Sequence, residues 1–168
     1  MKSYYNAWIV RFHTKEAGRM EHRANLARRF YQLFCETDLV YREAAAGLGL
    51  THSVFEILYA VWNYGDDMRC PLQEVRRRSG LGKQTVNSAL RRLEGEGLVC
   101  LERAGGKHKD VCLTVQGAAL AKRTVVRIME AENAAFSGWT DQEVDSYLAL
   151  AEKYLSALRE AARGLNVR

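Results

Sequence analysis

The sequence lacks the features of a membrane or exported protein. Its apolar runs fall well short of the roughly 18 residues that a membrane-spanning helix needs. The N-terminus has no apolar segment followed by a small-residue cleavage site, so no signal peptide is indicated. We therefore expect a cytoplasmic protein, and a length of 168 residues suits one domain with a substantial core.

Motifs for catalysis and for cofactor binding are also missing. The chain has no GxSxG, no Walker glycine loop, no GxGxxG and no HExxH. No cysteine pair has CxxC spacing and the histidines form no cluster with one another, whereas a zinc site needs clustered ligands. We therefore predict no enzyme activity, no cofactor, no metal site and no structural disulfide. The cysteines are expected to be free thiols: Cys35, Cys70, Cys100 and Cys112.

Positive charge is concentrated in one segment of the chain. The formal net charge is +5, and the segment from Arg69 to Asp110 holds ten Lys or Arg residues against five Asp or Glu. The remaining residues carry fifteen of each sign, so the whole excess lies in this segment. A solvated surface usually mixes the two signs, whereas a local positive excess is typical of a surface that binds a polyanion.

The same segment has the element order of a winged helix-turn-helix. Its periodicity predicts two short helices joined by a glycine-containing turn, then two strands joined by a glycine-rich basic loop. The only proline, Pro71, precedes the first helix and suits a first helical turn or an edge strand. The predicted elements are a helix over 72–79, a helix from Lys83 to about 95–97, strands over 98–101 and 111–115, and the loop 104–110.

The second of these helices carries two opposite stripes. One is apolar and has the spacing of a buried helix face: Val86, Ala89, Leu90 and Leu93. The other offers hydrogen-bonding side chains: Gln84, Asn87, Ser88 and Arg91. Asn and Gln pair with adenine edges, Arg pairs with guanine, and Ser bonds several groups, so this stripe suits a DNA major groove. An ordinary solvated helix face is the alternative.

A long helix is predicted on the N-terminal side of this segment. Residues 1–14 are apolar enough to need a partner surface, and their pattern fits either a helix or a strand. From about residue 15 to Gly47 the pattern is helical, which corresponds to a length of about 45 Å. Its apolar face is Leu26, Phe30, Leu33, Phe34, Thr37 and Tyr41. A helix of this length exceeds what so small a domain can cover, so we expect it to contact a second subunit.

Threonines mark the starts of the remaining helices. Thr51 is a good N-cap, with Ser53 as a rival one turn later. One continuous helix is predicted over 114–136, and Thr140 with Glu143 forms a capping box for the last helix. The apolar face of that last helix is Val144, Leu148, Ala151, Leu155, Leu158 and Ala162.

Residues 50–117 resemble the DNA-binding region of MarR-type regulators (multiple antibiotic resistance repressors). The resemblance covers about 70 residues in order, and it lies in Leu50-Thr51 through Leu58, in 80–86 into 93–99, and in 111–114 with Gly117. It implies a mainly α fold with a small β-wing, in which a winged helix-turn-helix is flanked by long N- and C-terminal dimerisation helices. Within a single domain, 1–168, it implies a DNA-binding lobe at 50–116 and a helical dimerisation lobe at 1–49 and 117–168.

The resemblance also implies partners and sites. Double-stranded DNA is the expected partner, bound by a homodimer on a pseudo-palindromic operator. The expected major-groove contacts are Gln84, Thr85, Asn87, Ser88 and Arg91, and the expected phosphate or minor-groove contacts are Lys83, Arg92, Lys107 and Lys109. Relatives often bind a small aromatic or anionic effector between the two lobes. The candidate effector residues are Tyr31, Tyr41, His52, Tyr59 and Trp62, although aromatic stripes at helical spacing are more often core.

The chain departs from the family at the wing and in the second helix of the helix-turn-helix, the one expected to enter the major groove. Gly105 and Lys107 stand where family wings often carry Asp and Arg, and a lysine cannot make the forked contacts of an arginine. Ser88 stands where the family often has an arginine, so base preferences do not carry over. Two rival functions stay open: a winged-helix protein-interaction module, and a thiol-based redox regulator. Cys35 lies in the second half of the long helix, which is a poor match to the redox relatives.

Overall fold

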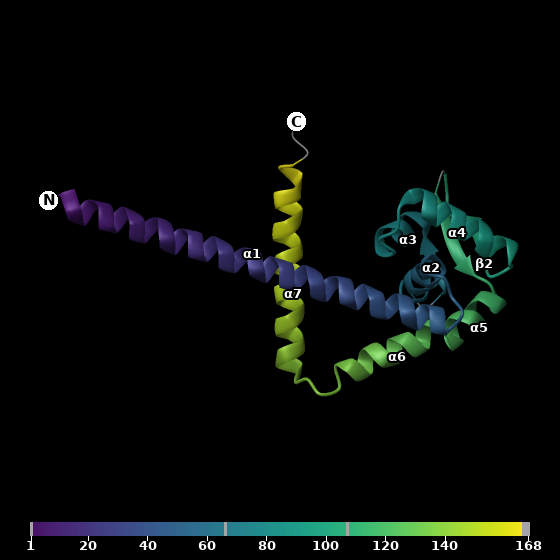
Figure 1. Cartoon of the computed structure of the whole chain (residues 1–168). Helices are drawn as coiled ribbons and strands as arrows, with labels where there is room; N and C mark the ends of the chain where they lie inside the picture. The colour runs from purple at the N-terminus through teal and green to yellow at the C-terminus, as the bar shows by residue number, and fades with distance from the viewer. Residues whose placement is uncertain (1, 66, 107, 166–168) are drawn as a thin grey trace.

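The computed structural model describes residues 2–65, 67–106 and 108–165, and it describes side chains at residue 22 and from residue 25 onward within those ranges. A long N-terminal helix leads into a compact lobe (Figure 1). The last helix crosses the N-terminal helix outside this lobe. The elements are α1 (Lys2–Gly47), α2 (His52–Trp62), β1 (Arg69–Pro71), α3 (Leu72–Arg78), α4 (Lys83–Gly95), β2 (Val99–Arg103), β3 (Lys109–Leu113), α5 (Val115–Arg123), α6 (Val125–Ala135) and α7 (Asp141–Arg163). The predicted fold class, mainly α with a small β-wing, is confirmed.

The sheet is small and antiparallel, with strand order β1-β3-β2. Strands β2 and β3 pair in a register that sets Cys100 opposite Cys112 and Arg103 opposite Lys109. The short strand β1 lies at the other edge of the sheet, where it pairs Cys70 with Val111 of β3. Pro71 ends this strand, so of the two positions that suit the proline the edge strand is the one observed, and α3 begins at Leu72.

One continuous core joins the end of α1 and the helices α2 to α6 to this sheet. Helix α2 lies at its centre and buries most of its residues, including Phe55, Leu58 and Val61. The predicted buried stripe of α4 is confirmed, because Val86, Ala89, Leu90 and Leu93 are all buried. The core also takes in Ala121, Val125 and Ile128 from α5 and α6, which lie beyond the predicted boundary of the DNA-binding lobe.

Two predicted caps are confirmed. The backbone N–H of Val54 donates to Thr51 Oγ1 over 3.4 Å, so Thr51 rather than Ser53 caps α2. At α7 the capping box is complete: the Glu143 N–H donates to Thr140 Oγ1 and the Thr140 N–H donates to the Glu143 carboxylate. Each cap satisfies backbone donors that the first helical turn leaves without a partner.

Two predicted helix boundaries are wrong. Helix α1 begins at Lys2 instead of near residue 15, so the open choice for residues 1–14 is decided in favour of a helix. The helix predicted over 114–136 is divided at Thr124, whose backbone leaves the helical region. The buried Thr124 hydroxyl donates to the Leu120 carbonyl over 2.7 Å, and such bonds compete with the helical ladder.

Gly117 lies against the backbone of Leu98, in the segment that joins α4 to β2. A β-carbon built at Gly117 would lie 1.8 Å from the Leu98 carbonyl oxygen, so even alanine cannot enter without moving the backbone. We expect Gly117→Ala to destabilise the fold by about 2 kcal/mol or more, as overpacking of a core does. Urea denaturation measures this as a lower midpoint at an unchanged slope.

Gly95 supplies the control for this substitution. It ends α4, and a β-carbon added there would meet no atom within 4 Å, so Gly95→Ala is expected to leave stability unchanged or raise it slightly. Equal midpoints for the Gly117→Ala and Gly95→Ala proteins would contradict the steric argument.

The terminal helices leave large apolar side chains exposed. Among the described residues of α7 none is buried, and along α1 the side chains of Phe30, Leu33 and Phe34 are exposed as well. The two helices touch where the Phe30 and Tyr154 rings lie 4.3 Å apart between centroids. Within the described ranges no single helix is long and apolar enough to cross a membrane, and only the bent pair 25–47 and 52–62 passes that test, by length and composition.

Candidate nucleic-acid interface

A tight turn positions α4 against α3. Gly80 adopts a positive φ of 64°, a conformation that favours glycine, and it ends the α3 segment. The hydroxyl of the buried Ser79 accepts the Leu81 N–H over 3.4 Å, which orders the turn. Helix α4 then begins at Lys83 after Gly82, which supplies no side-chain cap. The first N–H groups of α4 therefore remain available to an anion such as a DNA phosphate.

The outer face of α4 carries most of the predicted reading residues. Gln84, Thr85, Ser88 and Arg91 are exposed, on the side opposite the buried stripe. Asn87 is only half-buried, and its Oδ1 accepts a hydrogen bond from Arg76 Nη2 over 3.2 Å.

Arg76, on α3, was not among the residues predicted to contact DNA. Its guanidinium links α3 to α4 through Asn87, and its Nε is buried with no hydrogen-bond partner. The other two arginines of the run 76–78 both contact the Glu74 carboxylate. The sequence does not distinguish these three arginines, because their different partners depend on the direction in which each side chain points from α3.

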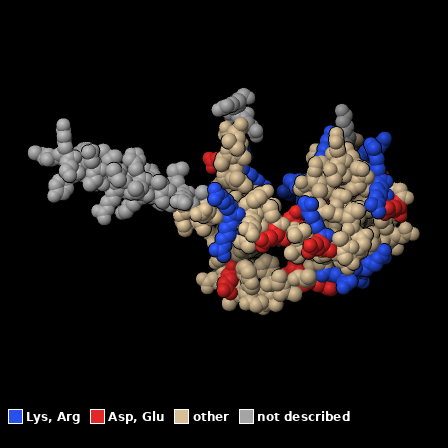
Figure 2. Space-filling view, in the orientation of Figure 1, with Lys and Arg blue, Asp and Glu red and all other residues tan. Residues whose placement is uncertain are grey.

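The basic residues around α4 divide into free and paired groups. In Figure 2, Lys and Arg side chains form several clusters toward the edges of the winged helix-turn-helix lobe at the right, and other residues cover most of the area between them. Lys83 is exposed at the start of α4, whereas Arg92 pairs with Glu96 over 2.8 Å. A DNA contact by Arg92 therefore requires that exposed pair to open, which costs little.

The wing is a short turn between β2 and β3. The Ala104 N–H donates to the His108 carbonyl over 3.1 Å, and Gly105 has a positive φ of 88°. Lys109 begins β3 opposite Arg103, and both side chains are exposed. The predicted contact Lys107 lies outside the described residues.

A pocket between α1, α2 and α6 collects part of the predicted effector set. Tyr41, Phe55 and Tyr59 line a cavity of about 200 Å³ together with Glu56 and Glu132. The Tyr59 hydroxyl donates to Glu132 over 2.8 Å, from residues 73 positions apart. A larger, mainly apolar hollow of about 570 Å³ between α1 and α6 shares Tyr41 and Glu132 with it.

The other three candidate effector residues lie elsewhere. His52 approaches Glu56 to 3.8 Å but does not line the cavity. Trp62 packs against the core, and Tyr31 is 68% exposed on α1. The two carboxylates, Glu56 and Glu132, were not among the predicted effector residues. Glu132 could have been found, because it continues the apolar stripe of Val125 and Ile128 at helical spacing.

The pocket raises the pKa of its acidic groups. Burial, assisted by the negative charge of Asp38, raises the pKa of Glu56 to about 7. Burial and the hydrogen bond to Glu132 raise the pKa of Tyr41 to about 12. The pocket therefore opposes additional negative charge and favours neutral or positive groups.

The raised pKa of Glu56 predicts a pH dependence of folding. Between about pH 4.5 and about pH 7 the folded chain holds a proton that the unfolded chain has lost, so stability falls as pH rises through this window. We expect Glu56→Gln to flatten that fall by about 1–2 kcal/mol, allowing for solvent screening of a partly exposed carboxyl. Urea denaturation of the wild type and of Glu56→Gln at pH 5 and pH 8 measures the change in unfolding free energy. An equal loss of stability in the two proteins between these pH values would contradict the prediction.

The comparisons with known proteins agree with the fold. The sequence model of the MarR family matches residues 48–109. Among curated proteins none is similar in sequence.

Among solved structures, the chain is similar to NMB1585, a MarR family regulator from Neisseria meningitidis, with a TM-score of 0.71, 19% identity and coverage of 84% of this chain and 96% of that one. It is similar to MepR of S. aureus in complex with DNA, with a TM-score of 0.60, 20% identity and coverage of 77% and 94%. It is also similar to BpsR of Bordetella bronchiseptica, whose DNA binding is regulated by 6-hydroxynicotinic acid, with a TM-score of 0.57, 23% identity and coverage of 78% and 96%.

Proposed function

We propose that this chain, whose residues 48–109 match the MarR family and whose fold is that of a winged helix-turn-helix protein, is a cytoplasmic, homodimeric transcription regulator that reads a pseudo-palindromic operator. The observation that carries the proposal is the polar, exposed face of α4 opposite its buried stripe. The free N-terminus of α4 supports it, and so does the local excess of positive charge. MepR, which shares the fold, has been solved with DNA. The proposal involves no catalytic step.

Selection of bound fragments from genomic DNA tests the function directly. We expect the wild-type protein to enrich a small set of sites with two related half-sites, and to bind them more tightly as salt is lowered. An absence of DNA binding at low salt would favour the protein-interaction module instead. Enrichment of DNA without any common sequence would leave a non-specific binder.

The terminal helices support the dimer. Exposed apolar side chains on α1 and α7 make a surface that one chain does not cover, and large exposed apolar patches mark interaction sites. The Phe30–Tyr154 contact holds α7 across α1, so both helices contribute to one surface. A second copy of the chain offers the matching apolar surface in a two-fold interface.

The pocket at Tyr41 and Tyr59 supports regulation by a small molecule. It lies between α1, which carries part of the proposed dimer surface, and α2, which packs on α4, so an occupant contacts both lobes. BpsR shows regulation of DNA binding by an aromatic acid. Glu56 and Glu132 favour a different ligand here, an aromatic molecule with a hydrogen-bond donor or a positive charge.

Repeating the fragment selection with metabolite extracts tests the effector. An extract component that releases DNA from the wild type but not from Glu132→Gln would support this pocket. DNA release by peroxide that is lost in Cys35→Ser would instead support the redox regulator.

A further inference from the structure

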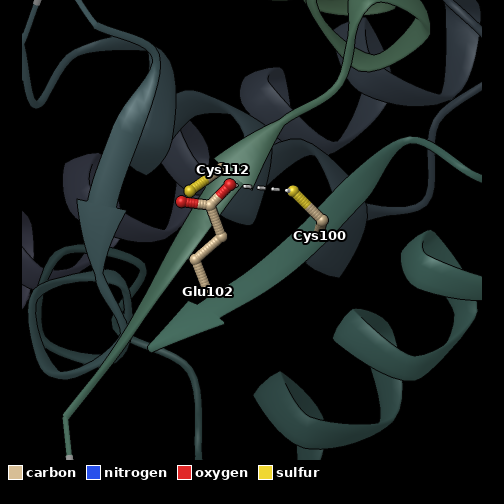
Figure 3. Close-up of side chains that lie close together, drawn as sticks. All are labelled: Cys100, Glu102 and Cys112. Atoms are coloured by element: carbon tan, nitrogen blue, oxygen red, sulfur yellow. Dashed lines mark hydrogen bonds between the residues drawn. The ribbon is translucent and has the colours of Figure 1, made fainter. Parts of the chain in front are cut away.

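Strand pairing brings two cysteines and a carboxylate together at the base of the wing. Cys100 on β2 lies directly opposite Cys112 on β3. Glu102 follows Cys100 by two positions, so it lies on the same face of the sheet. Figure 3 shows the Glu102 carboxylate between the two sulfur atoms. The two sulfurs and a carboxylate oxygen all lie within 4.8 Å of one another.

The geometry points to a metal site: we propose that Cys100, Cys112 and Glu102 bind one thiophilic d¹⁰ cation such as Zn²⁺, with water completing a tetrahedral shell. Zn–S bonds of about 2.3 Å and Zn–O bonds of about 2.0–2.2 Å set tetrahedral ligands about 3.5–3.8 Å apart. The present separations, at most 4.8 Å, need a contraction of up to about 1.3 Å, which side-chain rotations provide. Both strands are already paired, so the backbone need not move.

The chemistry of the cluster favours a metal over a disulfide. A metal ion binds cysteine as the thiolate and displaces the thiol proton. The carboxylate has no part in a disulfide, whereas it supplies a third ligand to the cation.

Arg69 pairs with the carboxylate that the proposed cation would bind. Its guanidinium reaches from β1 to pair with the Glu102 carboxylate, and Arg69 is the strand partner of Cys112. The side chain is 44% exposed, so it can turn into solvent when a metal takes Glu102. Metal binding therefore replaces a surface ion pair, a weak interaction, with a bond between β2 and β3.

This site would regulate the wing, a consequence that rests on the proposed function. The loop 104–108 begins two residues after Glu102, and Arg103 and Lys109 flank it. A cation that joins β2 to β3 restricts the base of this loop, and it frees Arg69 on the same face. We expect operator affinity to change when the metal binds.

Titration of the reduced full-length protein with Cd²⁺ tests the site, because thiolate-to-cadmium charge transfer gives an ultraviolet band. We expect one Cd²⁺ per chain, displaced by Zn²⁺. Cys100→Ser should abolish the band, Glu102→Gln should weaken binding about tenfold or more, and Arg69→Ala should strengthen it. Cys35→Ser, which removes an exposed cysteine on α1, is the matched control and should keep the full band. Cys112 is buried, so the half-buried Cys100 gives the cleaner variant if Cys112→Ser fails to fold.

Each outcome decides a separate point. A band that survives in Cys100→Ser, or that disappears in Cys35→Ser, overturns the site. Binding of Cd²⁺ with unchanged operator affinity in the presence and absence of Zn²⁺ overturns the regulatory role but keeps the site. Metal binding by a protein that binds no DNA overturns the proposed function and leaves the metal site standing.

Discussion

Substituting glutamate for Leu155 and Leu158 on α7 is expected to abolish the dimer and, with it, operator binding. Both side chains are large and apolar, 45% and 50% exposed in the single chain, and both lie on the predicted apolar face of α7. Burying a leucine contributes about 1.5–3 kcal/mol, and a two-fold interface contains four of these side chains. Because each side chain is already about half-buried in the single chain, their loss removes about 3–6 kcal/mol, before the added cost of burying charge.

Sedimentation measures the result. We expect the wild type to remain a dimer at micromolar concentration, with an interface well above the standard of about 1,600 Å², and the double variant to sediment as a monomer. Within the chain, no described residue of α7 is buried, so the core around α2 should stay folded in the variant.

Val115→Glu provides the control for these substitutions. Val115 is 89% exposed on α5, outside the terminal helices, so it tests the effect of a surface apolar-to-acidic change alone. It should leave the dimer intact. A folded wild-type monomer at micromolar concentration would refute the dimer proposal outright.

Replacing Arg91 with alanine is expected to weaken the selected operator far more than random DNA. Arg91 is exposed on the outer face of α4, where a major groove would lie. A bidentate contact to a base contributes about 1–3 kcal/mol of discrimination, and each dimer carries two copies. The expected loss is therefore about 2–6 kcal/mol per bound dimer.

Lys109→Ala is expected to act differently, because Lys109 lies on the wing and its contacts are electrostatic. Binding to all sequences should weaken alike, and the salt slope should flatten by about 0.9 for each lost phosphate contact. Lys122→Ala, which removes an exposed lysine from α5, is the matched control and should change neither quantity. The same comparison applies to Lys107, which was predicted on sequence grounds.

A salt titration on selected and scrambled duplexes separates the two roles. Equal losses on both duplexes for Arg91→Ala would show that α4 does not read sequence. Asn87→Ala is a less direct probe, because Asn87 accepts the hydrogen bond from Arg76 and its loss also affects the contact between α3 and α4. Half-sites about 10 bp apart, or a multiple of that, are expected from two reading helices related by a dimer axis.

Local patterns in the sequence determined most of the helices. The stripe Val86, Ala89, Leu90 and Leu93 predicted both α4 and its buried side, because an apolar face at helical spacing must pack on something. Thr51 and Thr140 identified the starts of α2 and α7, since capping needs only residues within one turn. The ordered combination of these patterns was sufficient to indicate a winged helix-turn-helix.

Contacts between distant residues depended on the tertiary structure. The Tyr59–Glu132 bond, the Arg76–Asn87 bond and the facing pair Cys100 and Cys112 join separate elements. Cysteine spacing along the chain predicted no metal site, whereas antiparallel pairing makes residues twelve positions apart direct neighbours. Periodicity reports which face of an element is buried; it carries no information on which other element covers that face, and that depends on how all the elements pack together.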